Sequence, residues 1–198
     1  MPRRLPLSVA VAGLALAVAS GCADETDPAA RVGDATVSHD ELLSEVEAWA
    51  GSPTLLQQLQ VPGSGSASGT GYSTEFVDLV LTNRVSFELH NSEFEARDLE
   101  LGDQEVEEVR AGLLGDPNAT AAALEELGAY GEQLVADVAR QVRVQTELGE
   151  GYEAWAAEAF GGDDIEVSPR YGSWDGATGA VLAPEGPRPA PGTSTFEL

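Results

Sequence analysis

The residues best able to do chemistry in this sequence are two histidines and one cysteine. His39 precedes Asp40 and Glu41, and a histidine paired with a carboxylate is a common general base. A serine nucleophile beside it would need a rigid turn, which the Gly/Ser-rich run 63–66 does not provide, because such a segment stays flexible. We therefore predict no catalytic residues and expect His39 and His90 to be surface or boundary residues of the domain.

The first 21 residues have the layout of a signal peptide for export. Arginines at positions 3 and 4 precede residues 5–20, which carry no charge and are too few to span a bilayer, since a transmembrane helix needs about 20 residues. Gly21 then lies directly before Cys22, the single cysteine. This order resembles the bacterial lipobox, in which the signal is cut before a cysteine whose thiol becomes lipidated.

We therefore predict a signal peptide over residues 1–21, cleavage after Gly21 and lipid attachment at Cys22. The alternative is an ordinary secretory signal followed by an incidental cysteine. Stable anchoring takes more than one acyl chain, and bacterial lipoproteins resemble that case, because they carry a diacylglycerol on the cysteine. The expected location is extracytoplasmic, on the cell membrane, with residues 22–29 as the lipidated cysteine and a short acidic tether.

The composition argues against several classes of function. Asp and Glu number 34 against 10 basic residues, all of them Arg, which gives a net charge of −24. A surface this acidic repels phosphate, so nucleic acid is not an expected partner. Two histidines and one cysteine are too few for an ordinary zinc site, and no phosphate-binding loop or EF-hand pattern is present. We predict no metal and no cofactor, and a solvated face at Asp163 and Asp164.

Helical patterns dominate the chain and predict a mostly α domain over residues 30–182, with short strands near both ends. Residues 30–37, which have Gly33 and Asp34 at their centre, predict a small β-hairpin. Ser38 and Glu41 have the spacing of a capping box, which begins a helix. Further helices are expected over 75–98, 103–114, 121–127, 131–149 and 152–160. The helix over 103–114 is expected to face the core with Val106, Val109 and Leu113.

The remaining segments are not helical in this prediction. The Gly/Ser-rich residues 62–74 are expected to be a flexible loop inside the domain, and the Pro-rich residues 183–198 a disordered tail. Alternation of apolar and polar residues indicates a short strand at 165–167, and the apolar residues 180–182 are a candidate second strand.

The helices over 75–98 and 131–149 are expected to pack against each other. Val80 and Phe87 lie on the central apolar stripe of the first, and Val138 and Val142 lie on a stripe of the second. We expect Phe87 to be part of the core rather than of an open groove, because aromatic residues make up only 6% of the chain.

Tyr171 and Trp174 belong to a turn-rich aromatic segment and have two interpretations. In the first, they cover the helical bundle from a C-terminal extension. In the second, they form an exposed apolar patch and are candidate contacts for a client polypeptide or another protein partner.

The order of four segments resembles SurA-type and PrsA-type foldases. Residues 32–42, VGDATVSHDEL, are similar to the opening pattern V-N-G-x-x-I-S-x-x-E-L. Residues 94–106, FEARDLELGDQEV, resemble E-A-x-x-x-x-I-x-V-S-D-E-E-V, with Gly102 in place of the capping serine. Residues 134–148 look like the family's return helix, and residues 167–175, VSPRYGSWD, resemble the V-N-P-R-Y-G-x-W-D tail of actinobacterial members.

The resemblance implies a SurA N-terminal-like helical domain that binds unfolded or partly folded exported polypeptides. Such foldases often carry a parvulin prolyl-isomerase domain before the return helix, but here that helix begins too soon after Asp103 to leave room for one. The first hypothesis is therefore a membrane-anchored, non-catalytic, chaperone-like lipoprotein of the cell envelope. The alternatives are a structural or assembly lipoprotein with one dedicated protein partner, and a peptidyl-prolyl isomerase with a cryptic site.

Overall fold

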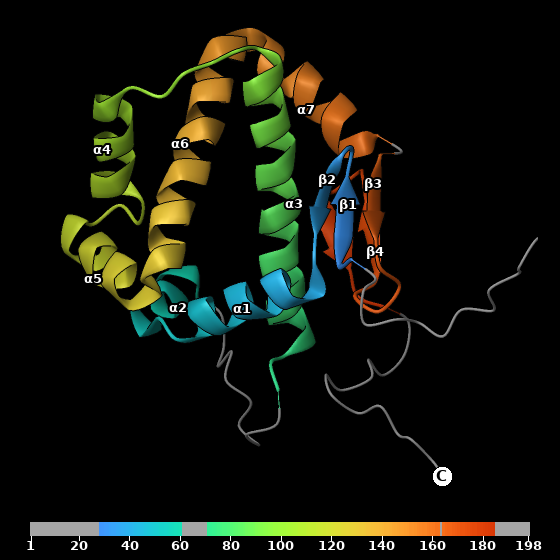
Figure 1. The fold of residues 1–198 in the computed structure, drawn as a ribbon, viewed down its shortest axis with the longest axis horizontal. Coiled ribbons are helices and arrows are strands. Elements are labelled where there is room, and N and C mark those ends of the chain that lie inside the picture. Colours follow the sequence, from blue (N-terminus) through green and yellow to red (C-terminus); the bar gives the residue numbers. More distant parts are fainter. Residues whose placement is uncertain (1–27, 61–70, 163, 185–198) are drawn as a thin grey trace, which may run out of the picture.

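The computed structural model describes residues 28–60, 71–162 and 164–184. They form a mostly helical body with short antiparallel strands from the two ends of the sequence, which confirms the predicted fold class (Figure 1). Helices α3 (Thr74–Ala96) and α6 (Ala129–Leu148) lie side by side through the middle, as the sequence predicted.

The predicted hairpin is present and forms two of the three strands of a sheet that joins the two ends of the described chain. Strands β1 (Ala30–Val32) and β2 (Ala35–Val37) are antiparallel, and Gly33 supplies the positive φ of 56° that their turn requires. β3 (Ile165–Val167) pairs with the other edge of β1, which gives the strand order β2-β1-β3. The sheet therefore holds the start of the domain against its end.

Helix α1 (His39–Ala50) begins as the capping box predicts. The Glu41 backbone N–H donates to the Ser38 hydroxyl, and the Ser38 N–H donates to the Glu41 carboxylate. Burial of this helix follows one face, through Leu42, Val46 and Trp49. Helix α2 (Pro53–Leu59) follows with Pro53 in its first turn, where a proline is tolerated because that turn needs no N–H donor.

The second half of the bundle contains α4 (Asp103–Gly112) and α5 (Pro117–Leu127). α5 begins four residues before the predicted 121, because the Asp116 side chain accepts from the Asn118 and Ala119 N–H groups and caps the helix. A 3₁₀ turn, Gly149–Gly151, then leads from α6 into α7 (Tyr152–Gly161).

The chain closes with a second hairpin. β5 (Ala180–Leu182) was predicted, whereas β4 (Ser173–Asp175) was expected to be part of a turn-rich segment and is a strand paired with β5. Gly172, at a φ of +123°, precedes β4, and a Cβ there would meet the Leu182 carbonyl oxygen. Only glycine fits this approach of the two strands.

Helix α6 presents two different sides to its neighbours, which the sequence prediction merged into one apolar stripe. Asp137 and Val144 lie on the side toward α3 and are buried, whereas Val138 and Val142 lie on the side toward α4. The expectation that Val142 faces α3 is therefore wrong, since its side chain is 45% exposed. Phe87 is 5% exposed and belongs to the core, as expected.

Candidate functional site

His90 is not a surface or boundary residue, contrary to the prediction, because it is fully buried on α3. Its Nδ1 lies 2.7 Å from the Ser86 carbonyl oxygen and its Nε2 lies 3.1 Å from the Tyr152 hydroxyl. A carbonyl only accepts, so Nδ1 carries the hydrogen and Nε2 accepts from Tyr152. The Trp155 and Phe160 rings pack against the imidazole, and burial lowers the pKa of His90. A neutral, doubly hydrogen-bonded imidazole is a structural element of the bundle.

The aromatic segment packs against the bundle rather than forming an open patch. Tyr171 is 4% exposed, and its hydroxyl is hydrogen-bonded to Nδ1 of His39 in the first turn of α1. Trp174 is half-buried, stacks on Phe160 and donates from its indole N–H to the Phe160 carbonyl at 2.8 Å. Tyr171 therefore offers almost no surface to a client, which favours the first of its two interpretations, a segment that covers the helical bundle, over the exposed patch.

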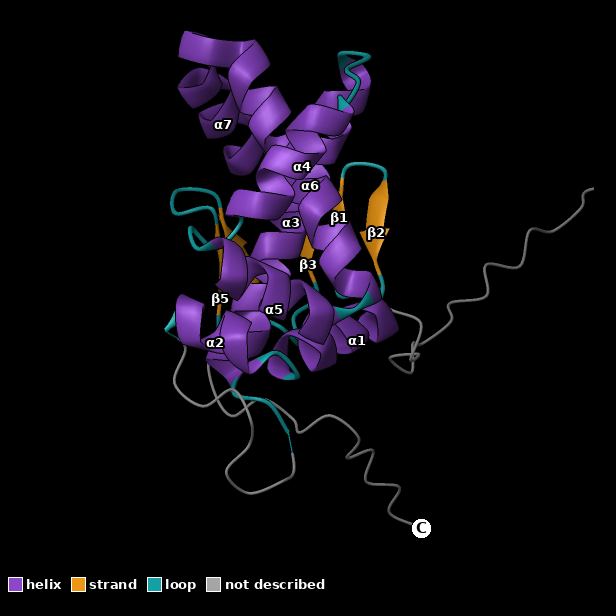
Figure 2. Cartoon of the chain, turned by 90° about the vertical axis from the view of Figure 1, so that its left-hand side faces the viewer, coloured by secondary structure: helices purple, strands orange, loops and turns teal. Residues whose placement is uncertain are grey.

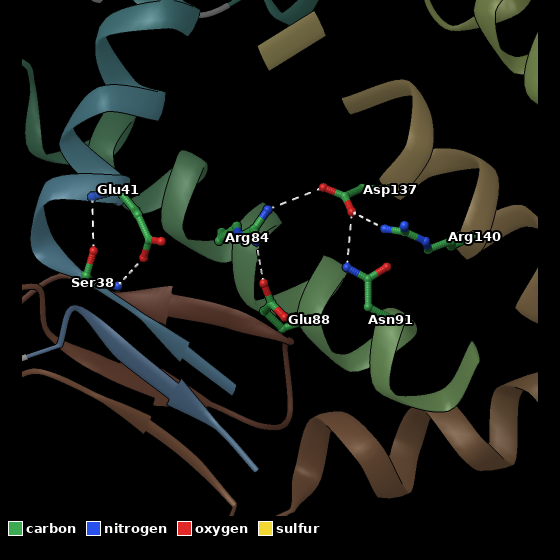
Figure 3. Close-up of polar contacts among 7 residues, drawn as sticks. All are labelled: Ser38, Glu41, Arg84, Glu88, Asn91, Asp137 and Arg140. Carbon is green, nitrogen blue, oxygen red and sulfur yellow. Dashed lines mark hydrogen bonds and ion pairs between the residues drawn. The ribbon is translucent and has the colours of Figure 1, made fainter. Parts of the chain in front are cut away.

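A charged cluster joins α3 to α6 (Figure 3), and we define it as Arg84, Glu88, Asn91, Asp137 and Arg140. The Asp137 carboxylate, 4% exposed, accepts hydrogen bonds from the Arg84 guanidinium at 3.3 Å, the Asn91 amide at 3.0 Å and the Arg140 guanidinium at 3.2 Å. Arg84 also pairs with Glu88 one turn along α3. These bonds satisfy a charge that would be costly to bury alone.

Glu45 of α1 lies close enough to this cluster to feel its charges. Burial raises the pKa of Glu45 to about 7, and the nearby carboxylates of Asp137 and Glu88 act in the same direction, while Arg84 opposes them. Three helices thus contribute acidic groups around one arginine. The arrangement ties the bundle together and leaves the guanidinium of Arg84 occupied by carboxylates of its own chain.

An open groove lies between α4 and α6, and we call it the α4/α6 groove. Its volume is about 420 Å³, within the range of roughly 300–1,000 Å³ typical of ligand-binding clefts. Figure 2 views the molecule from the α4 side, where these two helices lie together in front of the strands. The lining combines four large aliphatic side chains with polar ones at the rim: Val109, Leu113, Val138 and Val142, then Glu105, Glu108, Arg143 and Thr146.

The groove is open because α4 is only half-buried. In the described chain, no residue of α4 falls in the buried class, although Val106 and Val109 were predicted to face inward. The helix is held to α6 by charged pairs at its surface, in which Arg110 makes two hydrogen bonds of 2.7 Å to Glu132. Aliphatic side chains therefore remain available between α4 and α6.

Several predicted features lie outside the described residues. These are the signal peptide with Gly21, the lipid site Cys22, most of the predicted loop 62–74, and the tail from residue 185 onward. Within the described ranges, no helix is both long and apolar enough to cross a membrane, and no group of three or more His, Cys, Asp and Glu residues is placed to hold a metal ion.

The chain matches no protein-family model, no curated protein and no solved structure. The functional interpretation therefore depends on the residues and their geometry.

The groove residues were not identified as a site from the sequence. Val109 and Leu113 were assigned to the core from their helical spacing, and Val138 and Val142 to the contact with α3. The sequence contained one signal for the orientation of α6. Asp137 lies on the side of the helix that also carries Val144, and a buried acid must face a partner such as Arg84. Orienting α6 by this acid turns Val138 and Val142 away from α3.

Proposed function

We propose that this protein is a non-catalytic, chaperone-like lipoprotein of the cell envelope that binds apolar segments of unfolded or partly folded exported polypeptides in the α4/α6 groove. The observation that carries the proposal is an aliphatic groove of about 420 Å³ whose wall includes Val142 at 45% exposure. Exposed apolar surface within a concave site favours the binding of apolar side chains, because their burial removes apolar surface from water.

The start of the described domain lies away from the α4/α6 groove. Pro28 leads into β1, and β1 contacts α3 on the side opposite to α6 and α4 (Figure 1). The predicted tether therefore joins the described domain at Pro28, on the side away from the α4/α6 groove. This attachment point is compatible with polypeptides reaching the groove.

The geometry of both histidines supports a non-catalytic protein. Each ring nitrogen of His90 has a hydrogen-bonding partner inside the bundle, and His39 is bonded to Tyr171. A prolyl-peptide isomerisation assay with the purified protein should therefore show the uncatalysed rate. A clear acceleration that disappears in His39→Ala or His90→Ala, with folding intact, would instead assign an isomerase.

The groove is tested with a pair of substitutions that change one exposed aliphatic residue to Asp. Val142→Asp lies in the groove, and Leu182→Asp, at a residue 49% exposed on β5, is the matched control outside it. We expect Val142→Asp to weaken suppression of the aggregation of a denatured reporter protein, and Leu182→Asp to leave it unchanged. Equal behaviour of the two variants, with both folded by circular dichroism, would contradict the proposed site.

The choice between many clients and one partner needs a separate measurement. Crosslinking through a photoreactive residue at position 142 in envelope extract should capture many unrelated polypeptides. A single stoichiometric product would instead favour the assembly role.

The anchor is tested at Cys22. Cys22→Ala should abolish palmitate labelling and either release the protein from the membrane fraction or leave the precursor unprocessed. Palmitate labelling that persists in this variant would contradict lipid attachment at Cys22.

A further inference from the structure

The α4/α6 groove has an excess of negative charge at its rim. Glu105 and Glu108 of α4 line it together with Arg143 of α6. Arg143 is already engaged, since its guanidinium lies 3.3 Å from the Glu147 carboxylate and 4.0 Å from that of Glu105. Arg143 therefore already faces two carboxylates, and the two acids of the groove lining, Glu105 and Glu108, outnumber it.

Glu108 is the carboxylate of the groove lining that Arg143 does not contact. In the described part of the chain its hydrogen-bonding partner is the neutral Gln104 amide, at 2.7 Å, and no arginine pairs with it. Glu108 is exposed and stands beside Val109, the aliphatic residue of α4 that lines the groove. A bound segment that places an apolar side chain against Val109 therefore brings its neighbouring residues close to a carboxylate whose charge no arginine of the described chain neutralises.

We infer that the α4/α6 groove selects polypeptide segments in which an aliphatic residue is adjacent to Lys or Arg, and that Glu108 binds the positive charge of that neighbour. The inference rests on the proposed function and adds the class of segment that is bound. The apolar side chain enters between Val109 and Val142, and the cation pairs with Glu108 at the rim. An acidic neighbour instead meets Glu105 and Glu108 and is repelled.

The test compares two labelled peptides that share a central Leu-Val-Leu and differ only in flanking Lys or flanking Glu. Their affinities for the purified full-length protein are measured by fluorescence anisotropy. The Lys-flanked peptide should bind more tightly, and added salt should reduce the difference, because ions screen exposed charges. An exposed ion pair contributes enough for Glu108→Lys to weaken binding of the Lys-flanked peptide about threefold and to strengthen that of the Glu-flanked peptide.

Glu95→Lys is the matched control, because Glu95 is an exposed acid near the end of α3, outside the groove lining, and the change in net charge is the same. It should alter the peptide preference less than Glu108→Lys does, and Glu108→Gln should give an intermediate preference. Equal effects of the two lysine variants, or equal affinities of the wild type for both peptides, would overturn the inference.

If both peptides bind equally and Val142→Asp abolishes that binding, the proposed function stands without the charge preference. If neither peptide binds, both the inference and the groove as a binding site fail.

Discussion

The two sides of α6 show two ways in which one helix meets its neighbours. Toward α3, Asp137 and Val144 are buried, and the carboxylate receives three hydrogen bonds from charged or amide groups. Toward α4, Val138 and Val142 meet a helix with no buried residue of its own, held by exposed ion pairs. The α3 side is a closed interface, and the α4 side is an open one.

We therefore expect the α3 side of α6 to determine stability and the α4 side to determine binding. Free energy of folding comes mainly from surface removed from water and from buried polar groups that are satisfied. The α3 side has both, whereas the α4 side keeps part of its aliphatic surface exposed. Changes toward α3 should therefore affect unfolding, and changes toward α4 should affect binding.

The largest effect is expected from Asp137→Ala. Removal of this carboxylate leaves Arg84 without its partner on α6 and the Asn91 amide without an acceptor. Breaking a buried ion pair by removing one partner costs about 3–5 kcal/mol. Denaturant unfolding followed by circular dichroism should show a loss of this size.

Asp137→Asn is the matched variant, because it keeps the shape and an acceptor oxygen while removing the charge. It should cost less than Asp137→Ala. If Asp137→Ala costs under about 1 kcal/mol, the charged cluster does not hold α3 to α6, and the contrast between the two sides of α6 is lost.

Local signals in the sequence predicted most of the fold. Ser38 and Glu41 are three residues apart, and their capping box forms as expected. The pairing of β3 with β1 was not predicted, because nothing within a three-residue strand specifies a partner far along the chain. Pro53 and Pro117 follow the ends of α1 and α4 and also begin α2 and α5, because a proline can both end one helix and occupy the first turn of the next.

The candidate site was harder to predict than the fold. Helical periodicity shows that Val138 and Val142 are apolar positions of one helix, but it does not say which neighbour each side meets. That assignment depends on tertiary contacts, such as the hydrogen bond from Asn91 to Asp137. Whether a groove stays open also depends on how closely α4 approaches, which no local pattern encodes.

The second largest effect is expected from pH, because Glu45 titrates close to the charged cluster on the α3 side of α6. The ordinary pKa of Glu45, 4.5, is raised to about 7 in the folded protein, chiefly by burial. Between these values the folded protein holds a proton that the unfolded chain has lost, so stability falls as pH rises through this window. The linked loss is at most about 3 kcal/mol and is complete above pH 7.

Glu45→Gln isolates this contribution, because glutamine resembles the protonated carboxyl and does not titrate. The variant should gain stability over the wild type at pH 8 and match it near pH 4, as measured by denaturant unfolding at each pH. A constant difference between the two proteins across that range would contradict a proton held by Glu45.

The third effect compares two valines on opposite sides of α6. Val144 is fully buried and Val142 is 45% exposed, although only two positions separate them. Val144→Ala should cost about 2 kcal/mol, from lost burial and the cavity that remains, whereas Val142→Ala should change stability by less than about 0.5 kcal/mol. Thermal melting of the two variants side by side measures the contrast. Equal losses would mean that the groove is closed in solution.

The smallest effect concerns the attachment of α4 itself. Arg110 bonds to Glu132 of α6 with both terminal nitrogens, and this bond lowers the pKa of Glu132. The pair is exposed, so solvent and salt screen it, and Arg110→Gln should shift the melting midpoint less than Asp137→Ala or Val144→Ala does. Its effect should appear locally instead: hydrogen exchange should become faster for backbone amides of α4 and stay unchanged for those in the centre of α3. Since α4 forms one wall of the groove, looser attachment should also weaken peptide binding.

Arg97→Gln is the control, because it breaks an exposed pair with Glu93 at the end of α3 and should leave exchange in α4 as it was. If exchange in α4 is the same in the wild type and Arg110→Gln, this pair does not hold the open side of α6 in place.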